Sequence, residues 1–405
     1  MASSYTYRVR TPEGRVVQGK MQADGEASVA ARPGAQGLVP IQISKERKVS
    51  AKTELHILPE KVKLKDLAIF SRQFAVMVNS GLSLLRTLTI LSEQTENKKL
   101  GRTIVLLRDD VERGSSLSSA MTKYPDVFNP LFVSLVQAGE TGGQLDTVLV
   151  RVADSFEADY KLRQKVKSAM TYPVVVAGLA GVMVGIMLIF VVPTFATMFD
   201  GLGGELPLPT KILVIMSEQA KILVPLGIAL AIGGRILYKR LRKANANVRL
   251  VTDKLKLRVP VFGDLFQKIA VSRFARTLGL LLRAGVPILQ SLDIVADATG
   301  NEVLARASQD VKGSVRSGES MAGPLEGHKV FPPMVVQMIN VGETTGALDA
   351  MLSKIADFYE EEAEAAVVGL LTLLEPALVA LLGIVVGGLV IAMYLPILDL
   401  INHVG

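Results

Sequence analysis

The sequence predicts a mainly α-helical integral membrane protein with two homologous cytoplasmic helical bundles, three transmembrane helices and a small N-terminal α+β module. Three features predict this class: a long internal repeat, three long apolar stretches and an alternating segment near the N-terminus. Residues 330–349 resemble residues 127–146, and both contain the run Gly-Glu-Thr-x-Gly-x-Leu-Asp. Two similar segments about 200 residues apart indicate two copies of one domain, and not a short-period solenoid.

The composition indicates folded domains joined by a few membrane spans. The chain has 405 residues, 49% of them hydrophobic, and 20% are charged. The mean hydropathy of +0.38 is high for a soluble protein, but the charged fraction is too large for a chain that lies wholly in lipid. At this length two or three domains are expected.

Residue usage excludes several kinds of chemistry. The absence of cysteine excludes disulfides, thiolate metal sites and a cysteine nucleophile. His56, His328 and His403 lie far apart in the sequence, so no histidine metal cluster and no cofactor are expected. The chain has no Trp and only 5% aromatic residues, which argues against nucleic acid binding despite the net charge of +7. We attribute that charge to basic residues beside the membrane.

The N-terminal module, residues 1–45, is predicted to contain three strands and one helix. The N-terminus has no apolar core of a signal peptide, so no cleavable leader is expected. A polar linker, residues 46–63, follows. Within the module the predicted elements are strands at 5–10, 15–22 and 38–43, a turn at 11–14, and a helix at 26–32 that ends near Pro33.

From Leu64 onward the apolar residues recur with helical spacing. Gly81 ends the first predicted helix, and further helices cover 82–91 and 99–113. Asn129 followed by Pro130 predicts an N-cap with proline at the first helical position, and Gly139 is predicted to end that helix. A last helix after Gly143 is expected to continue into the first membrane span. The second copy repeats the plan at Phe274, Arg276, Gly285, Leu289, Leu292, Asn301, Leu304, Arg306, Gly318 and Ser320.

Three stretches are apolar enough to cross a membrane as helices. Residues 169–195 carry no charge, and residues 369–398 carry only Glu375. Both exceed the ~20 residues that a bilayer requires. Residues 222–238 are shorter and include Arg235, whose long side chain can reach the interface.

The Lys/Arg bias predicts that the N-terminus and both bundles face the cytoplasm. Basic residues precede the first span and follow the second, whereas the segment between these spans is acidic or neutral up to Lys211. The predicted segments after the linker are a first bundle (64–168), span one (169–195), an external segment (196–221), span two (222–238), a second bundle (239–368), span three (369–398) and an external tail (399–405).

The repeated motif suggests turns and partner contacts more than nucleotide binding. It lacks the lysine of a phosphate-binding loop and stands between helices, so its glycines are interpreted as an interhelical turn. Its threonines are expected to cap the following helix. Its glutamates have no evident structural task and are candidates for partner or metal contacts, with capping or plain surface exposure as the alternative. The candidate interaction residues are Glu140, Thr141, Asp146, Glu343, Thr344 and Asp349.

No arrangement of residues supports catalysis. The pairs Asp154/Glu157 and Asp357/Glu360 have the spacing of exposed helical faces, where solvated carboxylates are favoured over an acid–base pair. The run 360–364 is interpreted as a solvated acidic face or a dock for a basic partner. No Ser-His-Asp arrangement, zinc spacing or dinucleotide fingerprint is present.

The spans contain candidate residues for helix packing. Pairs of glycines one turn apart permit close approach of two helix backbones, either within the chain or in a dimer. Glu375 is placed either in the membrane or at its interface. The prolines are expected to bend their helices. The candidate packing residues are Pro173, Gly181, Gly185, Glu375, Pro376, Gly383 and Gly387.

The doubled motif, the Phe-x-Arg run at Phe70 and Phe274, the Thr171-Tyr-Pro173 and Leu374-Glu-Pro376 segments and the three spans resemble one known family. It is the family of inner-membrane platform proteins of type IV pilus and type II secretion systems. The resemblance covers about residues 64–398, and the N-terminal module is similar to that of the pilus branch.

The resemblance implies a non-enzymatic, multi-pass protein of the cell inner membrane that couples a hexameric assembly or retraction ATPase to insertion or extraction of pilin or pseudopilin. It also implies other inner-membrane assembly proteins as partners, contact with membrane lipid and a homodimer. Some relatives hold a metal with carboxylates in the first bundle. Here Arg86 stands where a carboxylate would be expected, so no metal site is inferred.

Three alternatives remain open from the sequence. The platform can belong to a type II secretion pseudopilus, or to a DNA-uptake system, instead of a pilus. The duplication is also found in small membrane transporters, although three spans with one carboxylate offer little for a substrate path. A membrane enzyme that uses Glu140 or Glu343 is the remaining alternative.

Overall fold

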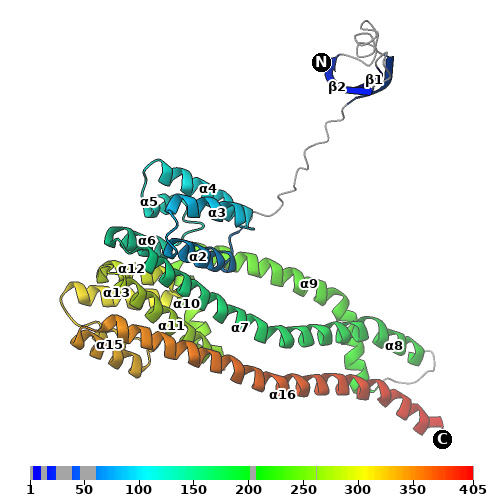
Figure 1. The fold of residues 1–405 in the computed structure, drawn as a ribbon. Coiled ribbons are helices and arrows are strands. Elements are labelled where there is room, and N and C mark those ends of the chain that lie inside the picture. The colour runs from blue at the N-terminus through cyan, green and yellow to red at the C-terminus, as the bar shows by residue number, and fades with distance from the viewer. Residues whose placement is uncertain are drawn as a thin grey trace. The chain divides into compact units, whose positions relative to one another are not determined.

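The computed structural model describes residues 3–10, 16–23, 39–45, 61–200, 207–260 and 262–404. These residues belong to two compact units, Met1–Lys61 and Val62–Gly405 (Figure 1).

The first unit contains a three-stranded antiparallel sheet. Its strands are β1 (Ser3–Arg10), β2 (Val16–Ala23) and β3 (Val39–Lys45), in the order β2-β1-β3. The central strand pairs Tyr5 with Met21, and its pairing with β3 shifts register between Arg8 and Val9. The three predicted strands are confirmed within a few residues. The predicted turn at 11–14 and helix at 26–32 lie outside the described residues.

The first repeat is a bundle of short helices followed by one long helix. Asn97, Ser116 and Asn129 each accept a hydrogen bond from a backbone N–H of the turn that follows, so polar N-caps start three of its helices. Pro130 occupies the first turn of its helix as predicted. The helices are α2 (Leu64–Asn79), α3 (Leu84–Gln94), α4 (Lys98–Glu112), α5 (Leu117–Thr122), α6 (Pro130–Gly142) and α7 (Leu145–Ile186).

The second repeat has the same order of helices. An additional helix, α10 (Ala246–Arg258), precedes it. Glycines with positive φ follow corresponding helices in both copies, because a left-handed residue ends a helix at little steric cost. The helices are α11 (Phe262–Arg283), α12 (Ile288–Ala298), α13 (Glu302–Arg316), α14 (Ala322–Glu326), α15 (Pro333–Thr345) and α16 (Leu348–Val404). The paired glycines are Gly81 and Gly285, Gly114 and Gly318, and Gly143 and Gly346.

The prediction that Gly139 ends its helix is wrong. Helix α6 continues to Gly142, and the left-handed residue is Gly143, with φ of 66°. Gly139 is instead needed for close packing inside the turn: a Cβ there would lie 3.0 Å from the Cβ of Val148.

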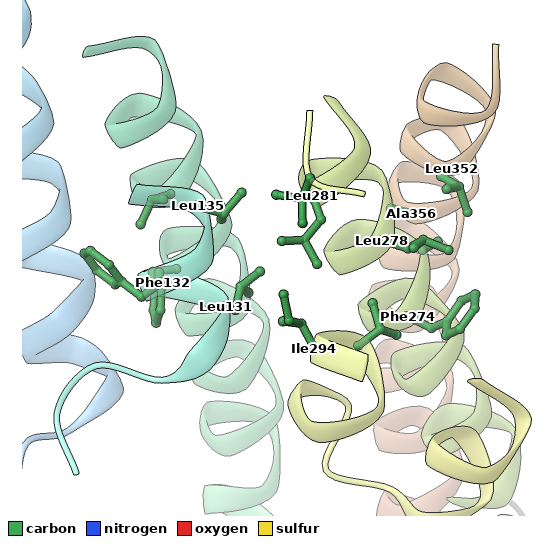
Figure 2. Close-up of a cluster of buried hydrophobic side chains, with 14 of the residues drawn as sticks. Leu131, Phe132, Leu135, Phe274, Leu278, Leu281, Ile294, Leu352 and Ala356 are labelled. Carbon is green, nitrogen blue, oxygen red and sulfur yellow. The ribbon is translucent and has the colours of Figure 1, made fainter. Parts of the chain in front are cut away.

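The two repeats share one hydrophobic core. Leu131 and Leu135 of α6 point toward Leu281 of α11 and Ile294 of α12 (Figure 2). All four are at most 7% exposed and belong to a single cluster of buried residues that extends through both copies. Burial of one such side chain contributes about 1.5–3 kcal/mol, so separating the repeats would expose a costly apolar surface.

Long helices connect the bundles to the apolar segments. Helix α7 has 42 residues and α16 has 57, about 63 and 86 Å at 1.5 Å per residue. Helix α7 continues through a π-helical segment, η1 (Met187–Val191), into α8 (Val192–Asp200). Together with α9 (Leu208–Ala244), these form three helices long and apolar enough to cross a membrane, which confirms the three predicted spans.

Helix α9 contacts the other spans chiefly through its first half. The buried hydroxyl of Thr210 donates to the carbonyl of Ala392 in α16, and that of Ser217 donates to the carbonyl of Leu188 in η1. In contrast, every residue of α9 from 222 to 241 is exposed in the isolated chain.

Candidate functional site

The repeated motif forms a tight corner between two helices in each copy. In the first copy a Cβ at Gly139 would lie 3.2 Å from the Cα of Leu145, at the start of α7. In the second copy a Cβ at Gly342 would lie 3.0 Å from the Cα of Leu348, at the start of α16. The motif therefore determines how each long helix leaves its bundle, because only glycine permits this approach without displacement.

Each motif glutamate binds the N-terminal end of a short helix, α5 in the first copy and α14 in the second. Glu140 accepts hydrogen bonds from the backbone N–H of Leu117 at 2.5 Å and of Ser118 at 3.0 Å, at the start of α5. Glu343 accepts from the backbone N–H of Met321 at 3.0 Å and from the hydroxyl of Ser320 at 2.6 Å. A carboxylate is favourable there because the first N–H groups of a helix have no partner inside the helix.

Both glutamates thus have the structural task that the sequence left unassigned. The capping alternative describes their geometry, and the interpretation that they lack a structural task is wrong. The only sequence signal was the matching serines, Ser116 and Ser320, which lie more than twenty residues upstream.

The motif threonines do not cap the next helix, so that prediction is wrong. The Thr141 hydroxyl donates to the carbonyl of Gln137 at 2.8 Å, and Thr344 donates to Asn340 at the same distance. Each hydroxyl is therefore used within its own helix, four residues back.

The two motif aspartates differ in their contacts. Asp146 is exposed and has no ion pair in the described part of the chain. Asp349 lies 3.3 Å from Nε of Arg283.

Each repeat contains an arginine that binds two carboxylates of its long helix. Arg72 donates to both oxygens of Glu157, at 2.6 and 2.9 Å, and to Asp154 at 2.6 Å. In the second copy Arg276 donates to both oxygens of Glu360, at 3.2 and 2.7 Å. It also lies 2.8 Å from Asp357. A planar guanidinium fits a carboxylate in this two-bond arrangement.

These pairs correct the interpretation of the carboxylates as solvated faces. The Asp154 and Asp357 side chains remain 61% and 60% exposed, as expected for solvated groups. Those of Glu157 and Glu360 are only 27% and 26% exposed, because each lies under its arginine.

The ion pairs shift the pKa of their members. The hydrogen bond from Arg72 lowers the pKa of Glu157 below its ordinary value, against a smaller opposing effect of burial. The same contact raises the pKa of Arg72. Burial acts to lower the pKa of Arg276, but the hydrogen bond and charge of Glu360 raise it overall. Both arginines therefore stay charged, and Glu157 stays ionised to a lower pH than a free glutamate.

Further ion pairs connect one repeat to the other. Arg273 of α11 donates to Asp159 of α7 at 2.7 Å, and Lys165 of α7 lies 2.5 Å from Glu364 of α16. Glu364 belongs to the run 360–364, whose member Glu362 also pairs with Lys268 at 3.0 Å. Much of this acidic run is therefore neutralised within the chain.

A cavity of about 230 Å³ lies between the two repeats. Charged side chains of both copies line it, among them Asp159 and Arg163 of α7 and Arg273 and Arg276 of α11. Its charged groups are already engaged with one another. Over the described ranges, no group of three His, Cys, Asp or Glu side chains has the arrangement of a metal site.

The candidate packing residues of the spans differ in their surroundings. A Cβ at Gly181, Gly185, Gly383 or Gly387 would meet no atom within 4 Å. No described part of the chain therefore packs closely against these glycines, and their packing role stays a prediction about another molecule.

Glu375 and the two helix prolines lie where the first and third spans run side by side. Glu375 and Tyr172 line a groove of about 420 Å³ between α16 and α7, together with the buried Pro173. Pro376 follows on α16 and is exposed. The repeat thus brings the matching segments Tyr172-Pro173 and Glu375-Pro376 to one place.

Comparison with known proteins agrees with this repeat architecture. The family model described as "Type II secretion system (T2SS), protein F" matches residues 70–193 and again 274–396. A second model, "Type II secretion system protein F, N-terminal domain", matches residues 1–44.

Relatives match over nearly the whole chain. The chain is 42% identical to "Type IV pilus assembly protein PilC" of Thermus thermophilus, over 98% of each protein. It is 40% identical to the protein of that name in Myxococcus xanthus, over 98% of this chain and 95% of the relative. It is 33% identical to "Type II secretion system protein F" of Vibrio cholerae, over 99% of each. With both repeats and the N-terminal module matched, the chain belongs to the type II secretion system protein F family.

Proposed function

We propose that this protein is the inner-membrane platform of a type IV pilus assembly machine. In this role it couples a cytoplasmic hexameric ATPase to insertion or extraction of pilin subunits, with its N-terminus in the cytoplasm. Family membership supports a place in pilus or secretion machinery. The higher identity to relatives named for pilus assembly, 42% and 40% against 33%, supports the pilus branch.

The continuous helices that connect the bundles to the spans are the observation that carries this proposal. Helices α7 and α16 each begin at a motif corner and continue without interruption into an apolar span (Figure 1). Lys165 and Glu364 link the two helices near the membrane segments. A displacement of the bundles by an ATPase is therefore transmitted to the spans, since a continuous helix bends less readily than a loop.

The role is mechanical in this proposal, and the chain makes or breaks no bonds. The arginines Arg72 and Arg276 support this, because each is paired with two carboxylates of its own repeat. The motif glutamates support it too, since Glu140 is occupied by N–H groups of α5 and Glu343 by the Met321 N–H and the Ser320 hydroxyl just before α14.

An insertion in the full-length protein tests the mechanical coupling. Four glycines placed after Lys167 interrupt α7 between bundle and span, so we expect loss of surface pili while the ATPase still copurifies. The same insertion after Glu96, in the loop between α3 and α4, serves as the matched control and should retain pili. Normal piliation with the first insertion would contradict the proposal.

The secretion alternative makes a different prediction. A platform of a type II secretion pseudopilus would support export of secreted enzymes, and its loss would leave surface pili intact. Deletion of the gene followed by assays of both phenotypes separates the two functions.

We also propose that the protein forms a homodimer through its spans. Support comes from the unfilled space at Gly181 and Gly185. Leucine at both positions should weaken self-association in detergent and leave the thermal stability of the chain unchanged. Unaltered self-association would exclude this face as the dimer contact.

A further inference from the structure

The basic C-terminal end of α9 borders a groove. One part of the groove is lined by charged side chains and the other part by small apolar residues. The groove has a volume of about 870 Å³, within the range of small-molecule sites. It is lined by Ala231, Gly234, Arg235, Tyr238, Lys239, Arg242 and Arg249. All but Arg249 lie on α9, mostly three, four or seven residues apart and hence on one face.

The charged half of the groove holds four cations and no lining carboxylate. Arg242 is held at 2.9 Å by Asp253, and Arg249 lies 3.3 Å from Glu302. Arg235 and Lys239 have no ion pair among the residues that the structure describes. The groove is therefore left with unneutralised positive charge, and two of its cations are paired with carboxylates that do not line it.

The apolar half continues into the second span. Ala231 and Gly234 carry little or no side chain, and a Cβ at Gly234 would meet no atom within 4 Å. Residues 222–241 are all exposed, so none of the helices that the structure describes covers this segment. A ligand that fits both halves has an anionic group at the membrane surface and hydrocarbon below it.

We propose that this groove binds the phosphate headgroup of an anionic phospholipid. Arg235 and Lys239 contact the phosphate, and an acyl chain lies over Gly234 and Ala231. Basic residues beside a span attract anionic lipids in this way. The lipid would cover a span that the protein leaves bare and fix the depth of α9 in the membrane, next to the junction with α10.

Native mass spectrometry of the full-length protein, delipidated in detergent and titrated with phosphatidylglycerol, tests the proposal. We expect R235Q/K239Q to weaken binding about thirtyfold, because two cations are lost at the membrane surface. G234L should also weaken binding, since it fills the groove without a change in charge. The charge-matched control R240Q/K167Q, which alters two basic residues beside spans but outside the groove, should weaken binding much less than R235Q/K239Q.

Two further titrations distinguish the sources of the phosphate. Phosphatidylcholine should bind the wild type much more weakly than phosphatidylglycerol, and millimolar glycerophosphate should not displace the lipid. Equal binding by R235Q/K239Q and the wild type would overturn the proposal, as would equal binding of the two lipids. Displacement by glycerophosphate would assign the groove to a soluble phosphate compound instead. Thermal unfolding of each variant identifies any that fails to fold. If R235Q/K239Q does not fold, the binding of lipid by G234L still tests the proposal.

Discussion

Arg273 of the second repeat donates a 2.7 Å hydrogen bond to the carboxylate of Asp159 in the first. Both side chains are about three-quarters buried, with 28% and 27% exposure. The two side chains line the same cavity as Leu131 and Phe156, which belong to the hydrophobic cluster that both repeats share. The two copies are therefore joined by a directed polar contact as well as by apolar burial, and they are expected to move as one body.

Loss of this contact should destabilise the junction. We expect D159N to lower the free energy of unfolding by about 1 kcal/mol, because a partly buried charged hydrogen bond is removed. A double-mutant cycle with R273Q, followed by thermal unfolding in detergent, separates this pair from the neighbouring contact of Asp159 with Arg163. D146N is the control, since Asp146 is exposed. A coupling energy of zero would contradict the assignment.

The motif glycine should tolerate no side chain. We expect G139A to cost about 1–3 kcal/mol, because its Cβ would be forced against Val148 and Leu145. G142A is a control in the same helix, where a Cβ meets nothing within 4 Å. Alanine is the better helix former there, so it should stabilise by up to about 1 kcal/mol. Equal effects of the two substitutions on thermal unfolding would refute the packing role.

The motif glutamate should act through its cap. E140Q is expected to destabilise by about 1 kcal/mol, since it removes a charge from the N-terminal end of α5. T141V is the neighbouring control, because Thr141 is exposed and bonds only within its own helix. Hydrogen exchange at Leu117 and Ser118 provides a local measurement, and faster exchange in E140Q alone is the expected result.

The pair between Arg72 and Glu157 predicts a dependence of stability on pH. The hydrogen bond from Arg72 lowers the pKa of Glu157 in the folded state. Its stabilisation is therefore complete above the ordinary glutamate pKa of about 4.3 and is lost as the pH falls through the lower folded value. Below about pH 4.3 the free energy of unfolding should therefore fall more steeply with decreasing pH in the wild type than in E157Q.

D154N serves as the control for the acid limb. Asp154 contacts the same arginine, but its side chain is 61% exposed, so water screens the pair. We expect the stability of D154N to decrease with falling pH in the same way as that of the wild type. A curve for E157Q that coincides with the wild type at every pH would show that the pair contributes nothing to stability.

Local patterns in the sequence were enough to predict the repeat, the helices and the spans. Asn129 and Pro130 start their helix where they were expected, since a cap depends on residues a few positions away. The spans follow from length and hydropathy, because a bilayer requires a minimum run of apolar residues.

Only the tertiary structure decided what the motif and the charged residues do. Glu140 accepts hydrogen bonds from two backbone N–H groups that lie 22 and 23 residues earlier in the sequence. Arg273 and Asp159, which form an ion pair, are 114 residues apart in the sequence. From the sequence Gly139 was predicted to end its helix, and only the packing against Val148 shows why glycine is needed there. Helix starts and turns depend on residues close together in the chain, whereas these contacts depend on how separate helices pack. Burial of apolar side chains brings the helices together and thereby determines which polar side chains become partners.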